Sequence, residues 1–179
     1  MKLNYGLFTT VLTTLLFCAN GASAGLLFDP YVGATIGAGG QTLYADGDYD
    51  SDSAQSYGAV LGVDIPLVRI ELEYDFLNRK DSDVHLGMVN AYLKMPTPVI
   101  HPYIGAGIGS TFDGEIYGRE IDASVAYQGM LGLTFGLPVV PLDIDAEMRV
   151  LYSANVYENV SNSPDLLQYD LRLKLRFVF

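Results

Sequence analysis

The sequence has one cysteine, no tryptophan and few basic residues, and these absences narrow the possibilities. The cysteine, Cys18, lies in an N-terminal segment that we expect to be removed, which would leave the mature chain without disulfide bonds. Ten Lys and Arg residues stand against 21 Asp and Glu residues, giving a net charge of −11. Such a chain lacks the basic surface needed to bind nucleic-acid phosphates.

The N-terminus has the features of a secretory signal peptide. A short basic start precedes an apolar run over residues 7–19, and Ala22 and Ala24 occupy the small-residue positions before a cleavage site. We therefore expect a signal peptide at residues 1–24 and one exported domain at residues 25–179. A lipoprotein signal is disfavoured, because Phe17 stands directly before Cys18 where a small residue is expected.

The mature segment also lacks any apolar run of about 18 residues, so we predict no membrane-spanning helix. Half of the chain is nevertheless hydrophobic. An exported, apolar chain without disulfide bonds or spanning helices is either a soluble β-rich protein or a β-barrel that closes within a membrane.

Eight segments alternate apolar residues with polar or small ones, which is the pattern of β-strands. They span residues 31–39, 57–65, 68–76, 88–95, 102–110, 127–135, 142–152 and 169–179. One face of every segment is free of charge, while the other mixes charged residues with glycine. A soluble barrel would place the apolar faces inside, whereas uncharged faces on all eight strands indicate lipid outside.

The links between these segments alternate in length. The links at residues 39–56, 77–84, 111–123 and 153–168 are long, and the three between them are short and contain proline. This alternation is typical of extracellular loops and periplasmic turns. We predict an all-β fold, an eight-stranded antiparallel transmembrane up-and-down β-barrel, in which the even strand count closes the sheet without an edge.

The charged faces of the strands then line the lumen. Eight strands enclose a space that side chains fill, and buried charges persist mainly when they are paired. We predict a lumen filled by salt bridges, in preference to acid–base catalysis or an ion path, with the basic residues of the last strand meeting the acidic seventh strand. The predicted network comprises Arg69, Glu71, Glu73, Asp75, Asp143, Asp145, Glu147, Arg149, Arg172, Lys174 and Arg176.

Two further groups of residues are candidate metal sites. The first long link has aspartate at every second position from Asp46 to Asp52, but Ser51 and Tyr57 stand where a calcium-binding EF-hand has Gly and Glu. Weak binding of divalent cations stays open, with a solvated acidic loop as the default. His85 and His101 fall at opposite ends of the predicted barrel, so we predict no shared metal and no cofactor.

The chain resembles the small eight-stranded outer-membrane barrels of Gram-negative bacteria, of the opacity-protein and outer-membrane-protein-A transmembrane type. The resemblance covers roughly residues 28–179 and is carried by the segments "PYVGATIG", "PYIGAGIG", "RIELEYDF", "AYQGMLGLTF" and "LRLKLRFVF". Lys174 departs from the pattern, since such chains often have glycine there. The resemblance also implies a C-terminal assembly signal formed by Tyr169, Phe177 and Phe179.

This resemblance implies a monomeric, porin-like protein of the outer membrane, in contact with lipid and lipopolysaccharide. Its expected partners during biogenesis are the outer-membrane assembly machinery and periplasmic chaperones. The expected function is that of a surface or structural protein, with acidic loops for adhesion or host-factor binding. A narrow solute channel is one alternative, and a lipid A-modifying enzyme is another. We expect no enzyme, because His85 is the only plausible base and no serine is convincingly placed beside it.

Deletion of Phe179 tests the assembly signal. We expect less protein in the outer membrane, because the resemblance makes this aromatic terminus the signal that the assembly machinery reads. Quantitative blotting of membrane fractions would measure the change, and normal levels of the truncated chain would contradict the prediction.

Overall fold

The computed structural model describes residues 28–45, 48–79, 82–116, 119–120, 124–137, 140–153 and 165–179. The predicted signal peptide at residues 1–24 lies outside this part of the chain. Among the described residues, no helix has the length and apolar character needed to cross a bilayer.

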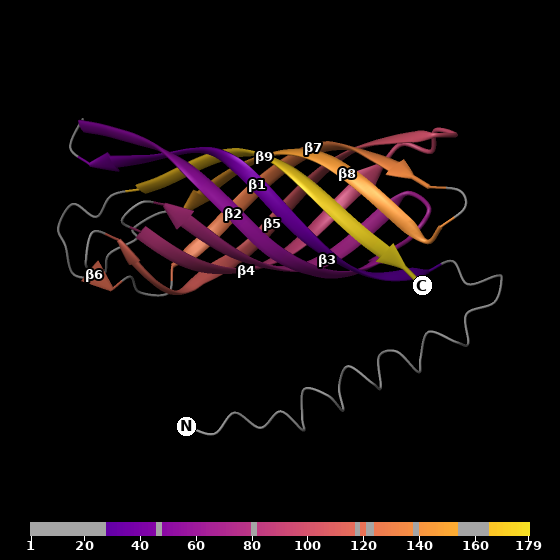
Figure 1. The fold of residues 1–179 in the computed structure, drawn as a ribbon, viewed down its shortest axis with the longest axis horizontal. Coiled ribbons are helices and arrows are strands. Elements are labelled where there is room, and N and C mark those ends of the chain that lie inside the picture. Colours follow the sequence, from indigo (N-terminus) through magenta and orange to yellow (C-terminus); the bar gives the residue numbers. More distant parts are fainter. Residues whose placement is uncertain are drawn as a thin grey trace, which may run out of the picture.

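Eight long antiparallel strands form a closed barrel, which confirms the predicted fold (Figure 1). A ninth, two-residue strand pairs with one of these eight and, among the described residues, with no other, so it is not part of the barrel wall. Each long strand pairs with the long strands before and after it in the sequence, and β1 pairs with β9. The strands are β1 (Asp29–Ala45), β2 (Asp48–Asp64), β3 (Val68–Arg79), β4 (Ser82–Lys94), β5 (Ile100–Ile116), β6 (Arg119–Glu120), β7 (Val125–Gly136), β8 (Leu142–Ser153) and β9 (Asp165–Val178).

The pairing of β1 with β9 closes the barrel along almost the whole length of both strands. The register runs from Tyr31 opposite Val178 to Tyr44 opposite Asp165. Beyond the last strand residue, the Phe179 backbone N–H donates a hydrogen bond to the Pro30 carbonyl at 2.9 Å. The C-terminus therefore lies beside the start of β1, at the end of the barrel where the short links are found (Figure 1).

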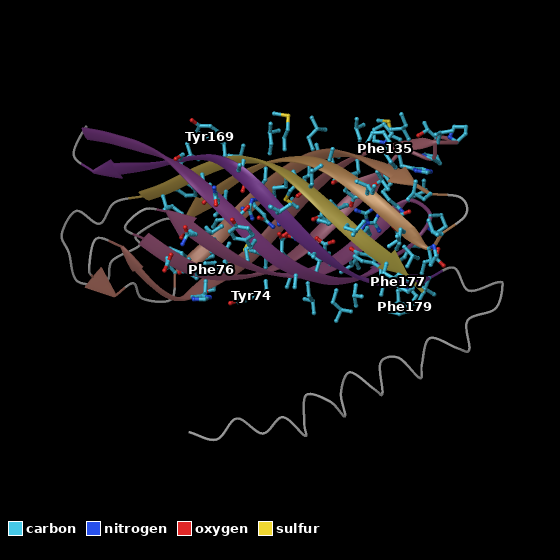
Figure 2. All side chains as sticks on the ribbon, in the orientation of Figure 1. Tyr74, Phe76, Phe135, Tyr169, Phe177 and Phe179 are labelled. Carbon is cyan, nitrogen blue, oxygen red and sulfur yellow. The ribbon has the colours of Figure 1, made fainter. Side chains whose placement is uncertain are left out.

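Side chains alternate between the outside and the inside of the barrel as the sequence pattern predicts (Figure 2). In β9, Leu171, Leu173 and Leu175 are 65%, 57% and 51% exposed. The intervening Arg172, Lys174 and Arg176 are at most 2% exposed. A soluble protein would show the opposite arrangement, so the outer wall suits an apolar solvent.

The predicted extents of the long links were wrong, because paired strand continues into them. The ladder between β1 and β2 extends to Ala45 opposite Asp48, and β5 continues to Ile116. Apolar alternation marks only the part of a strand that faces lipid, whereas backbone pairing continues into polar sequence beyond it. The short links, at residues 65–67, 95–99 and 137–141, contain proline as predicted.

Three inward-facing tyrosines each lie opposite a glycine of the next strand. The pairs are Tyr31 with Gly62, Tyr92 with Gly105, and Tyr103 with Gly132. A Cβ atom added to Gly132 would lie 2.4 Å from the Tyr103 ring and 2.8 Å from the Ala146 carbonyl oxygen. Glycine is therefore required where an aromatic ring fills the narrow lumen.

Substitution of two glycines in β7 tests this packing. We expect Gly132→Ala to destabilise the barrel by about 1–3 kcal/mol, because the added methyl overpacks the lumen. Gly129→Ala is the matched control: it lies on the outer wall with no atom within 4 Å of an added Cβ, so it should be neutral or slightly stabilising. Urea unfolding in lipid vesicles would measure both variants, and equal effects would contradict the assignment.

Candidate functional site in the barrel lumen

The lumen contains a layer of buried charged side chains contributed mainly by three strands. β3 provides a run of inward residues from Arg69 to Asp75, β8 one from Asp143 to Arg149, and β9 one from Asp170 to Arg176. Of the eleven residues predicted to form the network, all but Asp143 are buried, and Asp143 lies half-buried near the end of the lumen. Strands β3 and β9 are not neighbours in the wall, so contacts between them cross the lumen.

Glu71 and Lys174 form the central contact across the lumen. The Lys174 Nζ atom lies 2.6 Å from Glu71 Oε1, and neither side chain is exposed. The Glu71 carboxylate also accepts hydrogen bonds from the Tyr31 hydroxyl at 2.6 Å and the Tyr92 hydroxyl at 2.9 Å. These donors compensate for the water that the carboxylate loses on burial.

Two arginines join the carboxylates nearer the loop end of the lumen. Arg172 from β9 pairs with Glu73 and, at 3.1 Å, with Asp75. Arg149 from β8 pairs with Asp75 and forms two hydrogen bonds to Asp170, at 3.0 and 2.6 Å. The same arginines thus connect β3, β8 and β9 through charge-assisted hydrogen bonds, the stronger class of hydrogen bond.

A second group of ion pairs lies at the end where the chain terminates. Arg176 donates two hydrogen bonds to Asp145, at 2.9 and 3.1 Å, and one to Asp143 at 3.0 Å. Arg69 also pairs with Asp145 at 2.9 Å, and its guanidinium lies 5.2–5.8 Å from the ring centroids of three inward tyrosines. These rings favour the cation, since aromatic faces attract positive charge.

The predicted contact of the basic residues of β9 with the acidic residues of β8 is found for Arg176, Arg172 and Lys174, but the shortest contacts of Arg172 and Lys174 are with β3. Arg172 lies opposite Glu147 in the register, yet the two side chains are 3.6 Å apart and Arg172 makes its shorter contacts with Glu73 and Asp75. Lys174 likewise contacts Glu71 at 2.6 Å and Glu147 only at 3.8 Å. Long side chains span a narrow lumen, so closeness in the register does not decide their partners.

Glu147 accepts fewer hydrogen bonds than Glu71 does. Its Oε2 atom accepts a hydrogen bond from the Tyr103 hydroxyl at 3.0 Å. Its buried Oε1 atom has no hydrogen-bond donor among the described residues, and its ion pair with Arg172 is 3.6 Å long. The burial of this carboxylate is therefore less well compensated than that of Glu71.

Above the charged layer, towards the long links, the lumen is filled by apolar side chains. We name as the apolar layer the contiguous cluster of Leu77, Val84, Leu86, Met88, Ala126, Leu151 and Leu166, each at most 3% exposed. This layer was not predicted from the sequence. The signal that indicates it is a change from charged to apolar residues at inward positions, such as Leu151 after Arg149.

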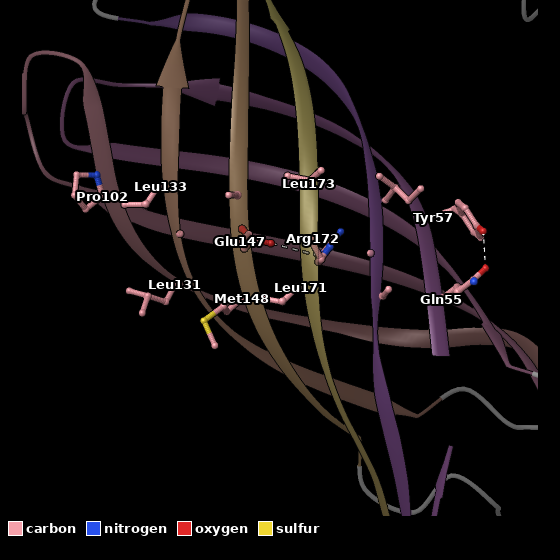
Figure 3. A pocket seen from close by; sticks show the side chains of 15 residues that line it. Gln55, Tyr57, Pro102, Leu131, Leu133, Glu147, Met148, Leu171, Arg172 and Leu173 are labelled. Carbon is pink, nitrogen blue, oxygen red and sulfur yellow. Dashed lines mark hydrogen bonds and ion pairs between the residues drawn. The ribbon is translucent and has the colours of Figure 1, made fainter. Parts of the chain in front are cut away.

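The outer wall has a shallow apolar groove of about 850 Å³ across strands β1, β2, β5, β7, β8 and β9 (Figure 3). Its rim includes Ile36, Leu133 and Leu173. The two charged residues in its lining, Glu147 and Arg172, are buried and belong to the lumen network. The groove therefore presents almost entirely apolar surface, which suits lipid chains rather than a polar substrate.

The two histidines lie in different surroundings. His85 lies partly exposed near the loop end of β4, where its Nδ1 atom is 2.7 Å from the Tyr74 hydroxyl and its ring is 5.0 Å from the centre of Phe76. His101 lies in β5 near the opposite end. Within the described residues, no cluster of three or more His, Cys, Asp or Glu side chains has the geometry to hold a metal ion.

The aromatic residues of the predicted assembly signal lie on the outside of β9 and at its end. Phe177 is 43% exposed and its ring contacts that of Phe179 edge to face, with centroids 5.2 Å apart (Figure 2). Tyr169 is 52% exposed towards the other end of the strand. In the acidic first link, Asp46 lies outside the described residues, and Asp48, Asp50 and Asp52 belong to β2.

No protein-family profile and no curated protein sequence match the chain. Among solved structures, neisserial surface protein A has a TM-score of 0.64 at 17% identity, over 85% of this chain and 98% of that one. The N-terminal β-barrel domain of OprF from Pseudomonas aeruginosa has a TM-score of 0.53 at 16% identity, over 82% and 97%. The outer-membrane enzyme PagL has a TM-score of 0.50 at 14% identity, over 80% and 97%. The chain thus has the fold of the small eight-stranded outer-membrane barrels, as the sequence resemblance predicts.

Removal of one partner of the central ion pair tests the lumen network. We expect Lys174→Met to destabilise the barrel by about 3–5 kcal/mol, because it leaves the Glu71 charge buried without a counter-charge. Adding Glu71→Gln to Lys174→Met should recover part of this loss. Lys94→Met is the control, because Lys94 pairs with Asp64 at the partly exposed end of the lumen. Unfolding midpoints would measure all three, and equal losses for Lys174 and Lys94 would count against a buried network.

Proposed function

We propose that the chain is an integral outer-membrane protein with a closed lumen, whose function is carried by its surface and extracellular end. This proposal rests on how side chains are divided between the two faces of the barrel wall: apolar side chains face outward and charged side chains face inward. Leucine and other apolar side chains cover the outside, while charged side chains inside are held in ion pairs. Only a membrane makes such an exterior favourable for a monomer.

Two successive layers support a closed lumen. The charged layer fills the middle and the chain-terminal end of the barrel with side chains that hold one another in place. The apolar layer fills the lumen towards the long links. Because an apolar constriction excludes hydrated ions by dewetting, the second layer adds a barrier that the first does not provide.

The extracellular end is then the part of the molecule available to partners. The hairpin of β1 and β2, two strands of 17 residues each, reaches beyond β3 at this end (Figure 1). The name of neisserial surface protein A, which has the same fold, describes that protein as a surface protein. We propose adhesion or host-factor binding at this end, together with a structural role in the envelope.

A lipid-modifying enzyme is the second candidate, because PagL shares the fold at a TM-score of 0.50. This second candidate can be tested at His85, the outward-facing histidine that lies beside Tyr74 and Phe76. We propose a packing role for this ring at the membrane interface, where aromatic and amphipathic side chains gather. Mass spectrometry of lipid A from a His85→Ala strain should show no change; lost lipid A remodelling would instead support the enzyme.

Conductance in planar bilayers tests the closed lumen. We expect the purified barrel to show no stable, reproducible conductance steps, since both layers exclude water. A Leu86→Ser, Leu151→Ser double variant should likewise remain closed, because the charged layer is still present. Reproducible steps from the unaltered protein would favour the solute channel. Membrane fractionation and a heat-dependent shift in gel mobility would separately test whether the chain is a membrane barrel at all.

A further inference from the structure

The outer part of β2 is a strand edge that has no partner among the described residues. β2 pairs with β1 over its whole length, from Asp64 to Asp48. Its pairing with β3 begins only where Gln55 lies opposite Asn78. Within the part of the chain that the structure describes, residues 48–54 therefore have a neighbouring strand on one side only, and the backbone N–H and C=O groups of their other side have no strand partner.

This edge is supported by a sheet. β1 pairs with β9 as far as Tyr44 opposite Asp165, so the projecting part consists of three strands in the order β2, β1, β9. Figure 1 shows the β1–β2 hairpin extending beyond β3. A strand that is already held in an extended conformation needs little further ordering to accept another strand.

The end of β5 is paired on both sides. Ile116 lies opposite Ser82 of β4 on one side and opposite Arg119 of β6 on the other. Among the described residues, the outer part of β5 lacks a second strand partner only at residues 112–114, a stretch that is shorter than residues 48–54 of β2.

The sequence of the edge determines which strand can pair with it. Residues 48–54 read DYDSDSA, with aspartate at three alternate positions and without proline. A second copy of the same edge would bring aspartates close to one another, and like charges across paired strands are destabilising. An incoming strand with Lys or Arg at alternate positions would be stabilised instead.

We infer that residues 48–54 bind an extended basic segment of another protein, which adds a fourth strand to the sheet of β2, β1 and β9. Backbone hydrogen bonds along the edge would supply most of the affinity, and the alternate aspartates would select the partner. This inference rests on the proposed function, since it requires the hairpin to lie outside the cell. It specifies how that end of the barrel would recognise a partner and what charge the partner carries.

A fluorescent peptide of alternating Lys and Thr residues, added to the full chain in neutral detergent micelles, tests the inference. We expect saturable binding that weakens by about tenfold or more when Asp48, Asp50 and Asp52 are all changed to Asn, a loss of about 1.4 kcal/mol or more. The matched control changes Asp113, Glu115 and Glu120 to their amides. It removes the same charge from the outer end of β5 and from β6, and it should leave the affinity unaltered.

Peptide methylated at alternate backbone nitrogens separates strand addition from simple charge attraction. This peptide keeps its lysines, but along one edge its backbone cannot donate hydrogen bonds to the carbonyl groups of β2. We therefore expect the methylated peptide not to bind. Equal binding of the methylated and unmethylated peptides would overturn the inference, as would equal losses in the two triple variants. Self-association of the barrel through this edge, seen as a concentration-dependent dimer that Asp48→Asn, Asp50→Asn and Asp52→Asn strengthen and the peptide does not compete with, would also overturn it.

A cysteine at position 51 tests the topology independently. In the mature chain, Ser51→Cys would be the only thiol, and a membrane-impermeant maleimide should label it on intact cells. Absence of labelling would refute the proposed orientation. Peptide binding in micelles does not depend on that orientation, so failure of the proposed function and failure of the inference can be told apart.

Discussion

The pairing of β1 with β9 is the contact on which the rest of the barrel depends. It joins strands more than 120 residues apart and satisfies the backbone groups that would otherwise remain as two open edges. In an apolar solvent each unsatisfied group would cost several kcal/mol, so only a closed sheet is stable there. Closure also defines the lumen, because eight strands leave a space just wide enough for side chains.

The narrow lumen explains both the charge network and the glycines. Charged side chains from β3, β8 and β9 meet across the lumen because it is narrow enough for long side chains to span it. Glu71, for example, receives Lys174 and two tyrosine hydroxyls. Each tyrosine in turn needs a glycine opposite, as Tyr103 needs Gly132. Buried ion pairs add little net stability compared with apolar packing, but loss of one partner is costly, so such a network favours one arrangement of the strands.

Much of the fold could be predicted from the sequence, because a strand between two environments has a period of two. That period identified which residues of β9 face outward and which face inward, Leu173 and Lys174 among them. The partners inside the lumen could not be predicted this way. Arg172 lies opposite Glu147 in the ladder yet contacts Glu73 and Asp75, since its length lets it cross to a strand that is not its neighbour. The outer parts of β1 and β2 were missed for a related reason: they are paired but not apolar.

The sequence by itself determined the class of the protein: an alternating chain whose uncharged faces require an apolar environment and whose even strand count allows closure. Tertiary structure alone decided three other features. These are the ion pairs across the lumen, the apolar layer formed by residues such as Leu86 and Leu151, and the edge of β2 that pairs with no second strand among the described residues. Each depends on which strands are brought together or left apart. The local periodicity of the sequence does not indicate which strands become neighbours, because it reflects only the environment of each strand face.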